Sequence, residues 1–178
     1  MKRGIARKEL ATVSASRQVP AVGLVYQAKL QIPCAVLGIR THAEHVIGLE
    51  FLPLSETTLQ PQDEFTRAVC AQLLAYVRNA DFQFDVPLLL TGTAHQSKVW
   101  QALRSIPCGE ARTYGDLAHQ LGSSPRAVGG ACGDNPMPLF IPCHRVVAKH
   151  GEGGFMHHAS GDPLAIKAWL LRHEGWQR

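Results

Sequence analysis

Short runs rich in aliphatic and β-branched residues fill the chain between residues 21 and 53. Three such runs are separated by short polar or proline-containing breaks: AVGLVYQAKL, CAVLGIR and EHVIGLEFL. This pattern predicts an antiparallel meander. Over 63–80 the apolar residues recur instead at helical spacing, which predicts one helix that covers the sheet. Its apolar face consists of Phe65, Val69, Leu73, Tyr76 and Val77.

A second helical pattern lies further along, in HQSKVWQALRSIP. Its apolar side consists of Val99, Trp100, Leu103 and Ile106. We therefore expect a domain boundary near Leu90, with an α+β domain over 21–90 and a mostly helical domain over 91–178. The first twenty residues are polar, carry five basic side chains and show no sustained period. They predict a basic, mobile arm over 1–20.

The stretch TYGDLAHQLGSSPRAVGG contains the signals for two short helices joined by a tight turn. Thr113 followed by Asp116 resembles a capping box, and Gly122 can end the first helix. Ser124 as N-cap and Pro125 as first helical residue can begin the second. This arrangement fits a helix-turn-helix, and equally an ordinary pair of antiparallel helices.

The second of these helices carries adjacent glycines, Gly129 and Gly130, which cost helix stability relative to alanine. Their bare surface allows another backbone to approach closely, either a neighbouring helix or a phosphate chain. Arg126 lies in the first turn, where the helix dipole disfavours a cation. Its placement favours an anionic partner outside the protein.

Composition excludes several classes of protein. The 178 residues include 18 Lys and Arg against 14 Asp and Glu, a net charge of +4 that permits nucleic-acid binding without requiring it. Five scattered cysteines without a Cys-x-x-Cys pair argue against a disulfide framework or structural zinc. No apolar run approaches the ~20 residues of a membrane span, and the N-terminus lacks a signal peptide's apolar core. We expect a cytoplasmic protein with no membrane contact.

The segment IPCHRVV places Cys143 directly before His144. In a strand, neighbouring side chains point to opposite faces, so any partnership between these two needs a relay or a bend. A lone cysteine in an apolar run is usually a small buried hydrophobe. Here, however, His144 could take the thiol proton through one bridging water, which would make Cys143 a nucleophile.

A third group should then orient the histidine, and Glu174 is the candidate. It lies in DPLAIKAWLLRHEG, which predicts a helix with Asp162 as N-cap, Pro163 as first residue and Gly175 at its end. A carboxylate in the last turn opposes the helix dipole, so it needs a compensating partner, for which Arg172 or solvent would also serve. Thiol, histidine and carboxylate would also fit a cysteine hydrolase.

Several separated motifs between Thr91 and Gly175 closely resemble the O6-alkylguanine-DNA alkyltransferases: KVWQALRSIPCGEARTYGDLA, RAVGGA, NPMPLFIPCHRVV and KAWLLRHEG. The resemblance implies direct DNA repair, by irreversible and stoichiometric transfer of an alkyl group from O6 of guanine, and possibly O4 of thymine, to Cys143. It implies no cofactor, a monomeric free protein and double-stranded DNA containing O6-alkylguanine as partner. The implied fold is a ribonuclease-H-like N-terminal domain followed by a winged-helix-like helix-turn-helix domain.

The resemblance also implies roles for individual residues. Cys143 would be the acceptor, activated by His144, a water and Glu174, while Tyr114 would donate to the leaving guanine. Asn135 would brace the turn before the active-site segment. Arg126 would fill the gap left in the duplex when the damaged nucleotide is flipped out. The residues implied in DNA binding are Arg126, Thr113, Tyr114, Gly129 and Gly130, and those implied in the substrate pocket are Cys143, Val146, Phe155 and Met156.

Two departures from the family pattern stand out. The turn before Arg126 is shorter than usual, and the family's Gly-Tyr-small-Gly-Gly loop is replaced by the longer GFMHHASGDP, over 154–163. Bulky residues in this loop predict a preference for methyl over benzyl lesions, unless they bulge into solvent. His150, His157 and His158 have no spacing suited to a metal, so we expect no metal site. A lesion-binding module without transfer and a cysteine hydrolase are the alternative functions.

Overall fold

The computed structural model describes residues 11–12, 25–157 and 162–177. The expected basic arm lies outside the described residues except for Ala11–Thr12, and His158 also lies outside them. Within the described part of the chain, no helix is both long and apolar enough to cross a membrane.

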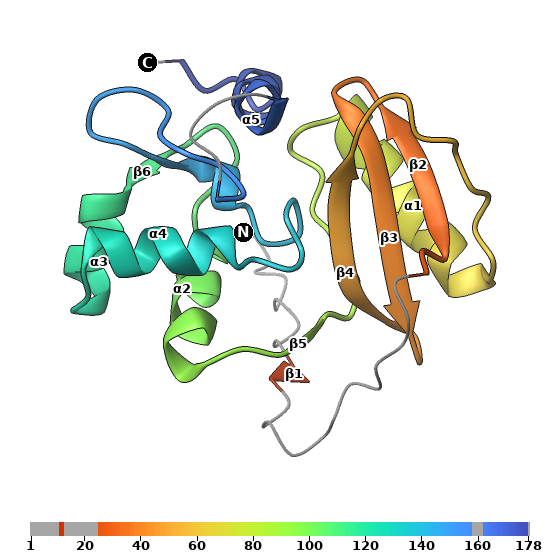
Figure 1. The fold of residues 1–178 in the computed structure, drawn as a ribbon, viewed down its shortest axis with the longest axis horizontal. Helices are drawn as coiled ribbons and strands as arrows, with labels where there is room; N and C mark the ends of the chain where they lie inside the picture. Colours follow the sequence, from red (N-terminus) through yellow and green to blue (C-terminus); the bar gives the residue numbers. More distant parts are fainter. Residues whose placement is uncertain (1–10, 13–24, 158–161, 178) are drawn as a thin grey trace, which may run out of the picture.

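The predicted meander is confirmed as an antiparallel sheet of β2 (Ala28–Ile32), β3 (Ala35–His42) and β4 (His45–Leu52), in that order. The predicted helix is α1 (Glu64–Arg78), which lies against one face of this sheet (Figure 1). Asp63 caps it by accepting a hydrogen bond from the Thr66 amide at 2.7 Å. Of the predicted apolar face, Val69, Leu73 and Tyr76 are buried, whereas Phe65 and Val77 are half-buried. The helix therefore positions Tyr76 in the interior of the protein.

A short parallel pair joins β5 (Leu89–Leu90) to β1 (Ala11–Thr12), and the chain then enters α2 (Ala94–Arg104). The predicted apolar side of α2 is buried as expected: Val99, Trp100, Leu103 and Ile106. The capping box at the start of α2 is formed by Thr93 and Gln96. Trp100 also donates its indole N–H to the Ala131 carbonyl at 2.8 Å, which ties α2 to the helix that follows later in the chain.

The predicted helix pair is confirmed as α3 (Tyr114–Leu121) and α4 (Pro125–Gly133), which follow β6 (Arg112–Thr113). Thr113 and Asp116 form the expected capping box, and Gly122 ends α3 with a φ of 59°, in the left-handed region that favours glycine. Ser124 caps α4 by accepting from the Ala127 amide at 3.2 Å. The tight turn fixes the direction in which α4 leaves α3.

The segment IPCHRVV is a bend and not a strand at the cysteine. Cys143–Arg145 form a single 3₁₀ turn, and Val146–Val147 form β7, which pairs with β6 in parallel. The last helix, α5 (Asp162–His173), begins at Asp162 itself, where the sequence predicted that residue to be the N-cap. Gly175 follows its end with a φ of 77°, as expected of a helix-terminating glycine.

One hydrophobic core runs through the described chain on both sides of Leu90. Leu49 of β4 donates its amide to the Pro136 carbonyl at 2.9 Å, and the Phe51 and Phe155 rings lie 5.9 Å apart. The α+β class is therefore confirmed, while the expected division into domains at Leu90 stays a prediction. The sheet also supports the segment that leads into Cys143.

Candidate functional site

Cys143 is buried, with 4% of its surface exposed, and Asn135 holds it in place. The Asn135 side chain donates from Nδ2 to the Ile141 carbonyl at 2.8 Å and to the Cys143 Sγ at 3.1 Å, and its Oδ1 accepts from the Met137 amide at 3.0 Å. One amide thus closes the turn over 135–141 and fixes the sulfur at its end.

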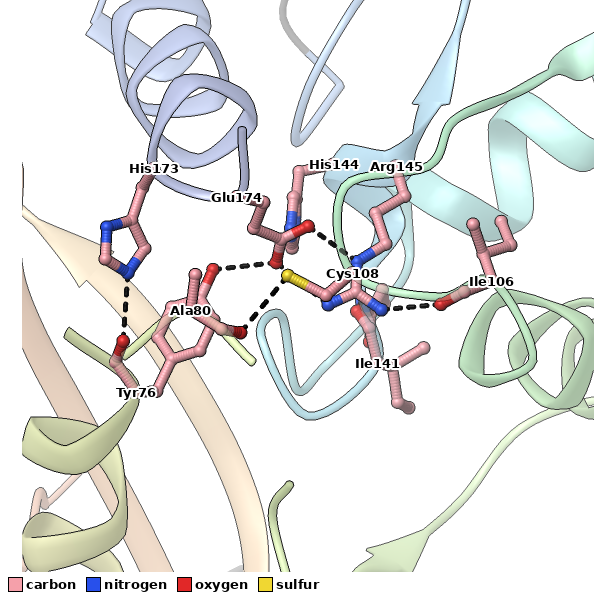
Figure 2. A network of polar contacts seen from close by, with 10 residues as sticks. Tyr76, Ala80, Ile106, Cys108, Ile141, His144, Arg145, His173 and Glu174 are labelled. Atoms are coloured by element: carbon pink, nitrogen blue, oxygen red, sulfur yellow. Dashed lines mark hydrogen bonds and ion pairs between the residues drawn. The ribbon is translucent and has the colours of Figure 1, made fainter. Parts of the chain in front are cut away.

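His144 lies beside Glu174, as Figure 2 shows. Its Nε2 lies 2.9 Å from Glu174 Oε1, and both side chains are 1% exposed. Because a carboxylate only accepts, Nε2 carries the proton, and Nδ1 presents a lone pair. Among the described residues, that Nδ1 is the buried side-chain nitrogen or oxygen without a hydrogen-bond partner. The ring therefore keeps one nitrogen available as a proton acceptor.

Glu174 is held by two further residues that sequence analysis did not identify. Arg145 donates from Nε to Oε2 and from Nη2 to Oε1, both at 2.8 Å, and from Nη1 to the Ile106 carbonyl at 2.6 Å. Tyr76 donates its hydroxyl to Oε1 at 2.9 Å. The charge that compensates Glu174 is thus Arg145 and not Arg172, which is exposed. The only signal in the sequence was the arginine that directly follows Cys143-His144.

The protonation states follow from these surroundings. Burial raises the pKa of the Cys143 thiol, although the hydrogen bond from Asn135 and the charge of Lys167 partly oppose this. Burial lowers the pKa of His144. Burial alone would raise the pKa of Glu174, but hydrogen bonds from His144 and Arg145 hold it well below its usual range. The resting site at neutral pH is therefore a thiol, a neutral imidazole and a carboxylate.

A lysine that the sequence did not single out holds two backbone carbonyls close to Cys143. Lys167 is fully buried and donates to the Val146 carbonyl at 2.6 Å and the Gly154 carbonyl at 3.0 Å. Burial lowers its pKa to about 8. The Tyr114 hydroxyl donates to the same Gly154 carbonyl at 3.1 Å, and burial raises the pKa of this tyrosine. Lys167 thus fixes the wall on which Tyr114 rests.

A cavity of about 280 Å³ opens beside Cys143. Its lining residues are Tyr114, Gly129, Cys132, Gly133, Cys143, Gly154, Phe155, Met156 and His157. Three of the four expected pocket residues line it, and Val146 does not. Val146 is buried behind the wall, with its carbonyl bound to Lys167.

The two adjacent glycines of α4 are little used for packing: Gly130 packs against no neighbouring helix, and Gly129 faces only the Tyr114 ring of α3. A Cβ added at Gly130 would meet nothing within 4 Å, and one at Gly129 would come no closer than 3.9 Å to the Tyr114 ring. The helix is anchored by other residues, among them the buried Val128. Arg126 is exposed in the first turn of the same helix. This surface of α4 is consequently open to an outside partner.

The unusual loop lies partly against the pocket. Phe155 is buried, while Met156 and His157 both have a positive φ, 51° and 61°. The His157 ring lies against Gly133, where an added Cβ would come within 2.3 Å of it, and its Nε2 lies 2.9 Å from Asp134 Oδ1. His157 therefore belongs to the pocket rim. No group of three or more metal-ligating side chains gathers anywhere in the described part of the chain.

Residues 94–176 match the family model of the 6-O-methylguanine DNA methyltransferase, DNA binding domain. The methylated-DNA–protein-cysteine methyltransferase of Methanosarcina acetivorans is 44% identical over 115 residues, which cover 64% of this chain and 71% of that protein. The chain belongs to the O6-methylguanine-DNA methyltransferase family. A further relative in this family, the methylated-DNA–protein-cysteine methyltransferase of Mycobacterium tuberculosis, is 41% identical over 126 residues, 65% of this chain and 76% of that protein.

Solved structures of the family agree with this fold. The R37L variant of the M. tuberculosis O6-methylguanine methyltransferase superposes with a TM-score of 0.70 at 36% identity, covering 82% of this chain and 90% of that one. The M. tuberculosis protein in complex with DNA gives a TM-score of 0.65 at 37% identity, with the same coverage.

Proposed function

We propose that this protein repairs DNA directly, by transferring the alkyl group from O6 of a guanine to the sulfur of Cys143. The observation that carries the proposal is the relay: a buried thiol at a pocket, next to a neutral His144 with an unpartnered Nδ1, whose other nitrogen is bound to Glu174. A member of this methyltransferase family needs such a thiol as acceptor, and a hydrolase would leave the open surface of α4 without a role.

The transfer conserves atoms and charge in four steps. The thiol proton passes to His144 Nδ1 through a water, and the sulfur attacks the alkyl carbon. The bond between this carbon and O6 breaks, and its electrons go to the guanine. Tyr114 donates a proton to the base, so that it does not leave as an anion. The proton on His144 then restores the tyrosine, and the net change exchanges the thiol hydrogen for the alkyl group.

Glu174 makes the first step possible because it stabilises the imidazolium that forms for a moment on His144. Its own charge is retained by Arg145, which remains protonated. The product is a thioether, a poor leaving group, so each molecule reacts once. Tyr114 must exchange its present acceptor, the Gly154 carbonyl, for the base.

The partner we propose is double-stranded DNA, bound by α3 and α4 as a helix-turn-helix within a winged-helix-like domain over 91–178. O6 of a stacked guanine cannot reach a buried sulfur, so the nucleotide has to be flipped into the pocket. Arg126 would occupy the gap, and Thr113, Tyr114, Gly129 and Gly130 would lie along the DNA backbone. The absence of packing at Gly130 supports this assignment.

The rest of the assignment follows the family. Residues 21–90 would form a ribonuclease-H-like domain, and the free protein would be a monomer without a cofactor. Asn135 would keep the sulfur aligned with the pocket, as its two contacts from Nδ2 favour. The carbonyl of Cys143, which lines the pocket, would accept from the exocyclic amine of guanine.

Incubation with a duplex containing O6-methylguanine, followed by intact-mass measurement and peptide mapping, tests the proposal. We expect one methyl group per protein, on Cys143, and none in a Cys143→Ser variant that still binds DNA. Methyl transfer to Cys132 or Cys108 would contradict it, as would tight lesion binding without transfer or repeated turnover of an ester or amide.

A further inference from the structure

We propose that Tyr76 is a positioning residue for the alkyl-acceptor relay, so that α1 takes part in the chemistry of a site built from the other end of the chain. The hydroxyl of Tyr76 would hold the Glu174 carboxylate in the orientation in which it accepts from His144. This inference rests on the proposed function, because it assigns a residue to the same relay.

The contact spans the molecule. Tyr76 and Glu174 are 98 positions apart, and their hydrogen bond of 2.9 Å is buried (Figure 2). Tyr76 is 3% exposed. Burial, together with the negative charge of Glu174, raises the pKa of the phenol, so the hydroxyl keeps its proton and remains a donor throughout the working pH range.

The geometry at Oε1 shows what the hydroxyl does. This one oxygen accepts from Tyr76, from His144 at 2.9 Å and from Arg145 Nη2 at 2.8 Å, whereas Oε2 accepts from Arg145 Nε. The Arg145 fork fixes the plane of the carboxylate. Tyr76 adds a donor on the same oxygen that His144 uses. Without the Tyr76 hydroxyl, Arg145 would be the only donor besides His144 itself that holds this oxygen in place.

The end of α1 is itself tied to the relay's surroundings by separate contacts. His173 donates from Nε2 to the Tyr76 carbonyl at 2.9 Å, and its ring stacks on Trp169 at 4.8 Å. Cys108 donates its thiol to the Ala80 carbonyl at 3.2 Å. These contacts hold the last turn of the helix in place, so the hydroxyl is presented at a fixed point. A ring needed only for packing could have been a phenylalanine.

The matched pair of variants is Tyr76→Phe and Tyr26→Phe. Both remove a hydroxyl that donates to a glutamate, but Tyr26 donates to Glu50 on the sheet, away from the relay. Tyr76→Phe keeps the ring that contacts Phe84 at 5.5 Å and His173 at 5.2 Å, so the fold should persist. Single-turnover rates on an O6-methylguanine duplex are measured against pH, together with affinity for unmodified duplex and thermal unfolding.

We expect Tyr76→Phe to slow transfer at neutral pH by roughly tenfold, about the size of one hydrogen bond to a charged group. The difference in rate between Tyr76→Phe and the wild type should become smaller as pH rises, because the thiol then ionises without the relay. The affinity for unmodified duplex should not change. Tyr26→Phe should transfer at the wild-type rate. A Tyr76→Phe profile that superimposes on the wild-type one would overturn the inference, even if the protein were less stable.

A double-mutant cycle separates action through Glu174 from a general structural effect. If Tyr76 acts through the carboxylate, then Tyr76→Phe should have no further effect on the rate in a Glu174→Gln background. Equal slowing in both backgrounds would overturn the inference. Wild-type protein that fails to take up methyl on Cys143 would instead refute the proposed function, so the two failures are distinguishable.

Discussion

At the scale of single residues, burial affects the three residues of the proposed relay, Cys143, His144 and Glu174, in different ways. Cys143 and His144 are both nearly excluded from water, and both favour their neutral forms. Glu174 is as deeply buried yet charged, because His144, Arg145 and Tyr76 all donate to it. Cys143 is thus a protonated thiol in the resting protein, and the thiol proton must leave during the reaction.

Loss of either activating group should therefore slow transfer in a pH-dependent way. His144→Ala removes the base, and we expect a roughly hundredfold lower single-turnover rate at neutral pH, the lower end of what a general base contributes. Glu174→Gln should also slow transfer. Both should recover only at a pH well above the ordinary thiol pKa of about 8.5, because burial raises the pKa of Cys143.

The control for these variants is His150→Ala, which changes an exposed histidine. Glu174→Gln also leaves the Arg145 charge without its carboxylate, so the folded fraction has to be measured before rates are compared. Wild-type rates for His144→Ala at neutral pH would remove this histidine from the mechanism.

At the scale of elements, α4 combines a firm anchor with a bare surface. Pro125 and the Ser124 cap begin the helix, and Val128 packs into the core, while Gly129 and Gly130 leave the other side free. Arg126 stands at the exposed start. An element of this kind can approach another backbone without losing its own support.

Arg126→Ala should impair repair of duplex DNA more than reaction with free O6-benzylguanine. A side chain that fills the gap offsets part of the unstacking cost of a few kcal/mol, so we expect roughly a tenfold greater loss on the duplex. Single-turnover rates on both substrates check this. A loss confined to affinity, with a salt slope smaller by about one unit, would indicate a simple phosphate contact.

The pocket loop is the second element with a specific expectation. Met156 and His157 hold left-handed backbone conformations, and His157 rests on Gly133 and Asp134 at the pocket rim. His157→Gly should widen the rim and raise the rate on O6-benzylguanine relative to O6-methylguanine by roughly tenfold. The same duplex carrying each lesion gives the ratio. As a control, Lys149→Gly changes a residue outside the pocket lining and should leave this ratio of rates unchanged. If His157→Gly also leaves the ratio unchanged, His157 does not determine the size of the substrate.

The sequence was most informative where structure is local. Caps, turn glycines and helical periods predicted α1, α2, α3 and α4 because neighbouring residues determine them. It placed Tyr76 on the buried face of its helix but gave no role to the hydroxyl, and it was silent on Arg145 and Lys167, since these roles depend on groups that fold next to them from far along the chain. Glu174 was found together with its contact to His144, but the arginine that compensates its charge is Arg145 and not the alternative Arg172, because the nearest arginine in sequence is not the nearest in space.

At the scale of the whole molecule, Glu174 joins α1 in the first half of the chain to the Cys143 segment in the second half through one buried charge. Such a group makes folding stability depend on pH. Its folded pKa is well below the ordinary 4.5, and that of His144 lies below 6.5. In both cases the unfolded chain binds more protons than the folded protein as acid is added, so stability should fall as pH drops below these ordinary values.

We expect the free energy of unfolding to decrease between neutral pH and about pH 4, because both groups have a lowered pKa in the folded protein. Urea titrations at several pH values measure it. The slope should flatten in His144→Gln and Glu174→Gln. A slope that persists in both variants would assign the acid sensitivity to other groups.

The relay also has a consequence for the order in which the protein becomes reactive. A ribosome makes the chain from its N-terminus, so Cys143 and His144 exist before Glu174, which lies 30 positions beyond the histidine it contacts. Until α5 is made and docks, the sulfur is an ordinary thiol, and His144 has no carboxylate to steady it. We therefore expect a nascent chain without α5 to react more slowly with O6-alkylguanine than the folded protein does.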